Sequence, residues 1–217
     1  QIVDGLIERV DVGVPKNEVI AEVYRDAILG VEGVWGDYPA VAPMLPSGSD
    51  GSASNLNWDE RPFAPNETTF LKISGCYRRY HAPLSRTIFL GTPQDKMKRV
   101  EAAVVEGLEA GIDAARAGSR ACDVALALAE SMERTGFEWS GRCGYPVGLS
   151  YPPDLGERTI SLRASDESVL EPNMTFHLSS ALWMGDNGIE IAESIRITED
   201  GAAEVFCNRP RGVIAKA

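Results

Sequence analysis

A weak internal repeat constrains the fold of this chain more than any other feature of its sequence. A pair of amphipathic helical segments, broken by a glycine, occurs at residues 2–30 and again at residues 97–135. An acidic residue and a valine follow Gly13 and Gly118 at the same distance. Strand-like segments follow each helical pair. Two such halves predict one α+β domain with pseudo-two-fold symmetry, each half an αα pair plus antiparallel sheet, and a site between the halves.

The spacing of apolar residues predicts where the individual helices lie. Residues 2–10 form an apolar stripe at helical spacing, and Asn17 is a suitable N-cap for a second helix that runs to about Gly30. A long stripe over residues 94–116 and a shorter one over residues 121–135 predict the second pair.

Strands and turns are predicted for most of the remaining chain. The Ser/Gly-rich segment SGSDGSAS, within residues 31–67, has the composition of a flexible turn. Residues 68–91 predict two strands around a turn at Gly75. Further strands are expected around residues 144–151, 175–183, 189–197 and 203–207.

Charge excludes several classes of partner. The 217 residues include 21 Lys and Arg against 32 Asp and Glu, which gives a net charge of −11. A chain of this charge repels phosphate backbones and anionic membranes, so we expect neither nucleic acid nor membrane as a partner. No apolar run approaches the length needed to cross a bilayer, and no signal-peptide pattern opens the chain, so we expect a cytoplasmic protein.

Cysteine and histidine usage limits metal chemistry. The four cysteines lie far apart without a CxxC pattern, which is typical of reduced thiols rather than of a disulfide framework or a zinc site. With two histidines, the chain cannot form a three-histidine zinc site, and it contains no HExxH motif. Carboxylate-rich metal sites remain possible on these grounds.

The segment RCGYPVGLSYPPDLGERTISLR, residues 142–163, predicts a functional loop. Its apolar residues alternate as in a strand until Pro152 and Pro153 end the pattern. The acids Asp154 and Glu157 follow this break. Functional groups concentrate on loops that rigid elements hold, so the segment is either a reactive surface or a solvated hairpin loop.

Five motifs occur in an order and spacing that chance rarely produces. They are YRRYHAPLSRTIFLG (77–91), GLEAGIDAARAGSRACDVALAL (107–128), GYPVGLSYPPDLGE (144–157), LEPNMTFHL (170–178) and IEIAESIRITEDG (189–201). Over essentially all 217 residues the chain resembles the pita-bread family of creatinase, prolidase and methionine aminopeptidase. The resemblance implies a pita-bread fold in which residues 1–217 are the C-terminal catalytic domain of a longer chain. It also implies a homodimer.

The chain departs from the metallopeptidases of this family at the residues that bind metal. Those enzymes hold two metal ions with two aspartates on the hairpin, one histidine after a glycine and two glutamates on later strands. The corresponding positions here are Lys72, Pro83, Tyr145, Ser179 and, within IEIAES, Glu190 or Glu193. Lysine and proline supply no hard oxygen ligand, so the comparison predicts neither a metal site nor a cofactor.

Three segments resemble the ectoine hydrolases within this fold: CYRRYH-PLSRT, GLSYPPD-GE and LEP-MTFH. That resemblance implies a metal-independent hydrolase that opens the cyclic amidine of ectoine to N-acetyl-2,4-diaminobutyrate. One alternative is a creatinase-like or Xaa-Pro-peptidase-like hydrolase of another small amide or amidine. Another is a non-catalytic pita-bread module that binds a peptide or a partner protein.

Carboxylates are the first candidates for chemistry on an amidine. The loop with Glu157 resembles the creatinase segment that carries a substrate-contacting glutamate, so Glu157 is expected to be the amidinium partner or the nucleophile, or else a surface residue. Glu193, or Glu190 if the register differs, is the expected second carboxylate. Because alternate residues of a strand point to opposite faces, at most one of these two glutamates enters the same pocket.

Four other residues are candidates on the same resemblance. His81, on the hairpin, either moves protons or is structural. Tyr145 is placed to hydrogen-bond the substrate. Arg86 either binds a substrate carboxylate or forms a structural ion pair. His177 lies on an apolar strand, where core packing is favoured over catalysis, and it remains a candidate substrate-binding residue.

Overall fold

The computed structural model of this chain describes residues 2–156, 158–185 and 187–216. The helices are α1 (Ile2–Arg9), α2 (Lys16–Leu29), α3 (Asp95–Ala114) and α4 (Ala121–Arg134), with a 3₁₀ helix η1 (Gly48–Ser52). The strands are β1 (Thr68–Tyr77), β2 (Tyr80–Leu90), β3 (Arg142–Pro146), β4 (Leu162–Arg163), β5 (Thr175–Met184), β6 (Asn187–Arg196), β7 (Glu204–Val205) and β8 (Ile214–Lys216). These strands form one sheet in the order β1-β2-β6-β5-β3-β4, with β7 beside β6 and β8 parallel to β2.

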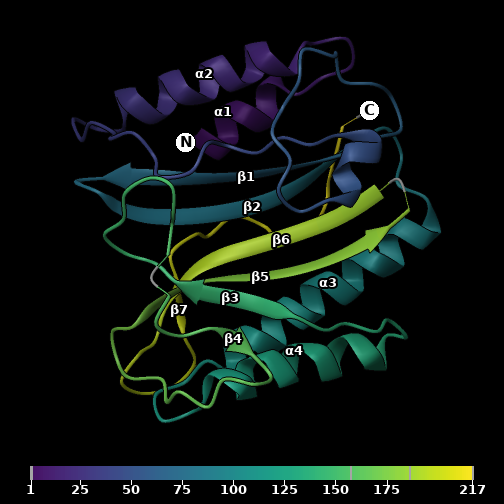
Figure 1. Ribbon diagram of the computed structural model, residues 1–217. Helices are drawn as coiled ribbons and strands as arrows, with labels where there is room; N and C mark the ends of the chain where they lie inside the picture. The colour runs from purple at the N-terminus through teal and green to yellow at the C-terminus, as the bar shows by residue number, and fades with distance from the viewer. Residues whose placement is uncertain (1, 157, 186, 217) are drawn as a thin grey trace.

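Each helical pair covers one half of this sheet (Figure 1). Leu71, Ile73 and Ile88 alternate along β1 and β2 so that they face α1 and α2 in one apolar cluster. Leu178 and Ile191 of β5 and β6 belong to a second cluster, which α3 and α4 complete. The sequence prediction of two αα-plus-antiparallel-sheet halves is therefore confirmed.

The helices of the second half follow directly from the sequence pattern. Val100, Val104 and Leu108 are four residues apart, so they share one face of α3, and all three are buried against the sheet. At the start of α4 the Asp123 carboxylate accepts the backbone N–H of Arg120 at 2.8 Å. This contact satisfies one of the N–H groups that a helix leaves unpaired at its start.

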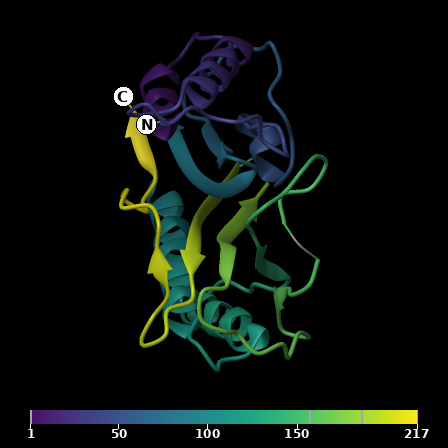
Figure 2. The ribbon, with the colours of Figure 1, turned by 90° about the vertical axis from the view of Figure 1, so that its left-hand side faces the viewer.

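The two halves are joined at β2 and β6 and along the C-terminal segment. Ser85 pairs with Ala192 across the junction, and the Thr87 hydroxyl donates to the Glu190 carbonyl and accepts the Glu190 N–H. The C-terminal segment, yellow in Figure 2, runs along one side of the molecule from the α3–α4 half to the α1–α2 half. There the Lys216 ammonium donates to the last carbonyls of α1.

Two predicted boundaries were wrong for identifiable reasons. The hairpin turns at Arg78 and Arg79, while Gly75 lies within β1, paired with Ala82. Both arginines have positive φ, 49° and 70°, a conformation that glycine adopts much more readily than arginine. The second helix begins at Lys16 rather than after Asn17, because the preceding proline sets the extended N-cap conformation.

The structure also revises the predictions for two further segments. The strand expected at residues 144–151 is shorter, since β3 ends at Pro146. The segment read as a flexible turn forms η1, in which Gly48 and Gly51 are buried. A Cβ on Gly188 would lie 2.3 Å from the Gly51 carbonyl, so glycine in β6 is what lets η1 pack on the sheet.

Among the described residues, every helix is too short or too polar to cross a lipid bilayer.

Candidate active site

A cavity of about 680 Å³ opens on the sheet face that points away from the helices. On β1, Lys72 lines the cavity, whereas its neighbour Leu71 faces α1 and α2, as alternation along a strand requires. Strands β2, β3, β5 and β6 supply the rest of the floor, and loops around residues 41–55 and 139–156 supply the walls. The cavity therefore draws on both halves of the fold, as the repeat predicted.

Strand register brings distant residues into one row across the cavity floor. Lys72 pairs with Ser85, Ser85 pairs with Ala192, and Ala192 pairs with Ser179. Glu190 lies two residues before Ala192 and therefore points to the same face. The residues of this row are far apart in sequence, and the antiparallel ladder alone makes them neighbours.

The only carboxylate that the described strands bring to the cavity is that of Glu190, which is 2% exposed. Its Oε1 lies 3.3 Å from the Lys72 ammonium, in an ion pair without hydrogen-bond geometry. Burial raises the pKa of Glu190, and the charge of Lys72 opposes that effect. A carboxyl with a raised pKa beside an ammonium is a group that can hold or release a proton within the cavity.

His177 lies beside Tyr145 on the cavity floor. The two rings belong to paired strand residues, and their centroids are 5.1 Å apart. His177 is 1% exposed, and neither ring nitrogen has a hydrogen-bond partner among the described residues. Burial, with the charges of Lys72 and Arg142, lowers the pKa of His177 to about 3, so the imidazole is neutral near pH 7. The expectation that this histidine belongs to the apolar core is thus revised: it is buried, but it lines the cavity.

The pKa of His177 predicts how stability depends on pH. The unfolded chain binds a proton at this histidine below its ordinary pKa of 6.5, whereas the folded chain does so only near 3. The free energy of unfolding should therefore fall as the pH decreases from 6.5 towards 3, and His177→Phe should flatten this decrease. Urea unfolding of both proteins at several pH values measures the difference. Equal slopes in the two proteins would contradict the assignment.

Tyr145 lines the cavity from β3 and is partly exposed. Burial, together with the nearby charge of Glu190, raises the pKa of Tyr145 to about 12, so its hydroxyl stays protonated. The Arg142 guanidinium lies 5.1 Å from the centroid of the Tyr145 ring. A neutral phenol in this position can donate a hydrogen bond to a ligand in the cavity.

The residues of the cavity do not fit a pair of divalent metal ions. The positions that correspond to family metal ligands lie on its floor: Lys72, Pro83, Tyr145, Ser179 and, on β6, Glu190. Glu190 is the one carboxylate among them, and it already forms an ion pair with the Lys72 ammonium. The described residues contain no group of three or more His, Cys, Asp or Glu that could hold a metal ion. Divalent ions in such sites need several oxygen or imidazole donors.

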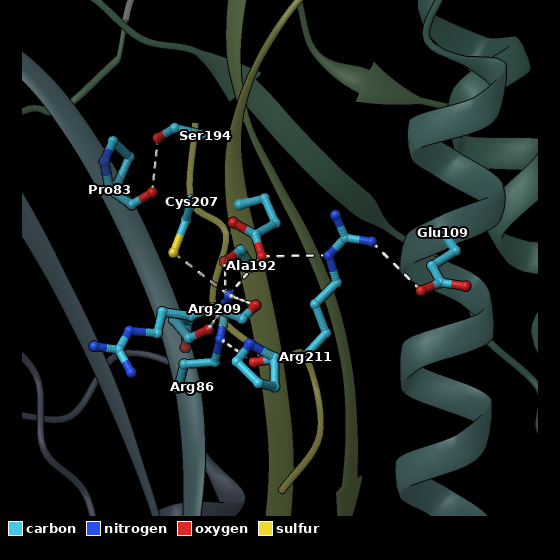
Figure 3. Close-up of polar contacts among 11 residues, drawn as sticks. Pro83, Arg86, Glu109, Ala192, Ser194, Cys207, Arg209 and Arg211 are labelled. Atoms are coloured by element: carbon cyan, nitrogen blue, oxygen red, sulfur yellow. Dashed lines mark hydrogen bonds and ion pairs between the residues drawn. The ribbon is translucent and has the colours of Figure 1, made fainter. Parts of the chain in front are cut away.

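Glu193 and Arg86 lie together on the opposite face of the sheet, outside the cavity. Arg86 Nη2 is 2.5 Å from Glu193 Oε1, and both side chains are almost fully buried. Arg211, in the C-terminal segment, lies 3.4 Å from the same carboxylate oxygen and reaches Glu109 on α3 (Figure 3). Of the two alternatives for Arg86, the geometry favours the structural ion pair. Glu193 is likewise not in the cavity, and Glu190 is the member of the pair that enters it.

His81 is also separate from the cavity. Its Nε2 accepts the backbone N–H of Ala40 at 3.0 Å, so the ring proton is on Nδ1, which faces the Cys76 sulfur at 4.0 Å. The residue is 6% exposed, and burial lowers the pKa of its imidazole. Because the nitrogen that could accept a proton is already occupied, the expected proton transfer by His81 finds no support in this geometry.

Glu157 lies outside the described residues, whereas its neighbours Gly156 and Arg158 line the cavity. Asp154 and Arg158 line the cavity and form an ion pair of 2.9 Å. Arg79, at the hairpin turn, holds the preceding residues: it donates to the Ser150 carbonyl at 2.9 Å and lies against the ring of Tyr151. Ser150 and Tyr151 are therefore held against the other half of the fold.

Sequence reasoning missed several residues of the cavity. Ser54 and Asn55, just after η1, line it, although Ser54 ends the segment that was interpreted as a flexible turn. Trp139 and Trp183 also line it, as does Arg142. The signal for Arg142 was available, because it begins the segment of residues 142–163 that was predicted to be a functional loop and that contains Tyr145.

Comparisons with known proteins identify the family of this chain. The sequence profile of metallopeptidase family M24 matches residues 1–199. An ectoine hydrolase from Halomonas elongata is 49% identical over 97% of this chain and 54% of its own length. A Xaa-Pro dipeptidase from Pyrococcus furiosus is 22% identical over 90% of this chain and 55% of its own length. The chain thus spans about half the length of these relatives.

Solved structures share the fold. The prolidase from Pyrococcus furiosus superposes with a TM-score of 0.87 at 22% identity, over 97% of this chain and 60% of that chain. The X-Pro aminopeptidase from Thermotoga maritima gives a TM-score of 0.87 at 20% identity, over 99% of this chain and 59% of that chain. The pita-bread architecture implied by the sequence motifs is confirmed.

Proposed function

Because this chain belongs to metallopeptidase family M24, we propose that its cavity hydrolyses a C–N bond in ectoine or in a close cyclic amidine. The observation that supports this most is the 49% identity with an ectoine hydrolase over 97% of the chain. The cavity supports it too, because its floor combines a buried carboxyl, an ammonium and a neutral imidazole where family metallopeptidases hold metal ions. The product would be N-acetyl-2,4-diaminobutyrate.

The chemistry of an amidine defines what the site must do. An amidine is protonated near neutral pH, and its delocalised charge makes the central carbon a poor electrophile. The site must hold this cation with a carboxylate, deliver an oxygen nucleophile to the central carbon and protonate the nitrogen that departs. Overall, the bond from the central carbon to the departing nitrogen breaks, the oxygen of water becomes the carbonyl oxygen of the new amide, and the two hydrogens of water end on the nitrogens.

We assign these roles to two carboxyl groups. We assign Glu157 as the amidinium partner or the nucleophile, because Asp154 and Arg158 on both sides of it line the cavity. We assign Glu190 as the proton donor to the departing nitrogen, because burial raises its pKa and Lys72 lies beside it. Tyr145 would hydrogen-bond the substrate through its protonated hydroxyl.

We further propose that this reaction needs no metal ion. The proposal depends on the donor set: an ammonium, a proline, a phenol and a hydroxyl stand at the positions that correspond to metal ligands in the family. Lys72 would instead supply the positive charge on the cavity floor. Homodimeric assembly and a cytoplasmic location, which the resemblance and the composition imply, stay predictions.

The test is proton NMR of ectoine with the full-length protein, in the presence and in the absence of a chelator. We expect the ring to open at the same rate in both samples. Loss of activity with the chelator, restored by a divalent ion, would overturn metal independence. No ring opening by a folded protein would overturn the ectoine assignment, and cleavage of dipeptides or of other amidines would then identify the alternative substrate.

A further inference from the structure

Arg142 carries a positive charge that no described carboxylate neutralises. It begins β3, lines the cavity and is exposed to it. The other cations of the cavity have partners: Lys72 pairs with Glu190, and Arg158 pairs with Asp154. Arg142 forms no ion pair within the described part of the chain, and its guanidinium lies against the face of the Tyr145 ring.

His177 provides a second and independent observation at the same place. A neutral imidazole has one N–H donor and one acceptor nitrogen, and both are buried here without a partner among the described residues. Leaving such groups unpaired is unfavourable, and polar groups in protein interiors are normally hydrogen-bonded. Because His177 lines the cavity, a ligand there can complete its hydrogen bonds.

These two side chains converge on one region of the floor. Tyr145 contacts both of them, with its ring 5.1 Å from the His177 ring centroid and 5.1 Å from the Arg142 Cζ atom. Lys72 adds a further positive charge near His177. An anion in this region would face a guanidinium and an ammonium and would accept the imidazole N–H.

We propose that Arg142 and His177 form a carboxylate subsite that anchors the acid group of the substrate and selects carboxylated amidines over neutral ones. The inference rests on the proposed function and identifies the part of ectoine that this region binds. One carboxylate oxygen would accept from the guanidinium and the other from His177, since a carboxylate offers lone pairs to several donors. Anchoring one end of the substrate would fix the orientation of the ring for hydrolysis.

The experiment measures binding and turnover separately in the full-length protein. Trp139 and Trp183 line the cavity, so tryptophan fluorescence reports the entry of ligands. The probes are ectoine, the same cyclic amidine without its carboxylate, and acetate. We expect Arg142→Met to weaken ectoine binding about 10-fold to 100-fold, the loss expected for a hydrogen bond to a charged group, and to leave the affinity for the neutral amidine unchanged.

Matched variants separate the subsite from general charge effects. Arg158→Met removes a cation from the same cavity, but the Arg158 side chain is 88% exposed and paired with Asp154. This variant should change ectoine affinity by less than about threefold, roughly the effect of a surface ion pair. His177→Asn, which keeps a donor and an acceptor, should retain more ectoine affinity than His177→Phe. An equal loss for both amidines in Arg142→Met, or no loss for either, would overturn the subsite.

The same measurements distinguish failure of the proposed function from failure of the carboxylate subsite. If wild-type protein leaves ectoine intact but binds acetate in a manner that Arg142→Met abolishes, the ectoine assignment fails and the carboxylate subsite stands. If wild-type protein opens ectoine but binds the carboxylated and neutral amidines equally well, the function stands and the subsite fails. Absence of carboxylate binding by wild-type protein with both ectoine and acetate also overturns the subsite.

Discussion

Replacing Arg86 with methionine is expected to lower the free energy of unfolding by about 3–5 kcal/mol. The substitution leaves the Glu193 carboxylate buried without its main partner, although Arg211 remains 3.4 Å away. Burial already raises the pKa of Glu193, and the charge of Arg86 is the largest effect that opposes it. Urea unfolding followed by circular dichroism, with ectoine turnover as a second readout, measures the change.

Two further variants make this prediction specific. Arg196→Met removes an arginine at the end of β6 whose guanidinium pairs with Glu204 of β7 near the surface. This variant should lower the free energy of unfolding by about 1 kcal/mol or less. The double variant Arg86→Met with Glu193→Leu removes both buried charges, so it should recover much of the stability lost in the single variant. A single variant as stable as the wild type would show that Glu193 is neutral in the folded protein.

Replacing Glu190 with glutamine is expected to reduce kcat for ectoine opening by about 10²-fold to 10⁴-fold, the usual contribution of a positioned acid or base. Glutamine keeps the shape of the side chain and can still hydrogen-bond, but it cannot deliver a proton to the departing nitrogen. Turnover measured by proton NMR, together with ectoine affinity from tryptophan fluorescence, separates a chemical defect from a binding defect.

Glu109→Gln is the matched control, because Glu109 lies on α3 outside the cavity and is 56% exposed. It should leave kcat unchanged. A Glu190→Gln variant with normal kcat would remove Glu190 from the chemistry, and a variant that loses only ectoine affinity would make it a binding residue. An unfolded variant would be recognised by its circular dichroism spectrum and replaced by Glu190→Asp, which is expected to retain a fraction of the activity.

The sequence predicted the order of the elements well, because periodicity is a local property. The stripe of Val100, Val104 and Leu108 and the alternation of Leu71 with Lys72 each lie within a few residues of chain. The hairpin turn was misplaced, since a pair of arginines with positive φ adopts the conformation usually given to glycine. Local propensity does not report the strand pairing that enforces such a turn.

The site was predicted less well, because its geometry depends on contacts between distant residues. Alternation showed that Glu190 and Glu193 face opposite ways, but it did not show which one faces the cavity. That choice follows from the pairing of β6 with β2 and β5, and from the partners that each glutamate finds at Lys72 and Arg86. The roles assigned to these glutamates stay predictions until the variants are measured.

The contacts of Arg86 have a consequence for how this sequence can vary. Four of its hydrogen-bond acceptors are main-chain carbonyls, belonging to Ser85, Ala192, Arg209 and Pro210. Every amino acid carries a carbonyl, so substitutions at these four positions leave the acceptors in place. Arg86 therefore joins the two halves and the C-terminal segment largely through main-chain acceptors, whose presence does not depend on the side chains at those positions.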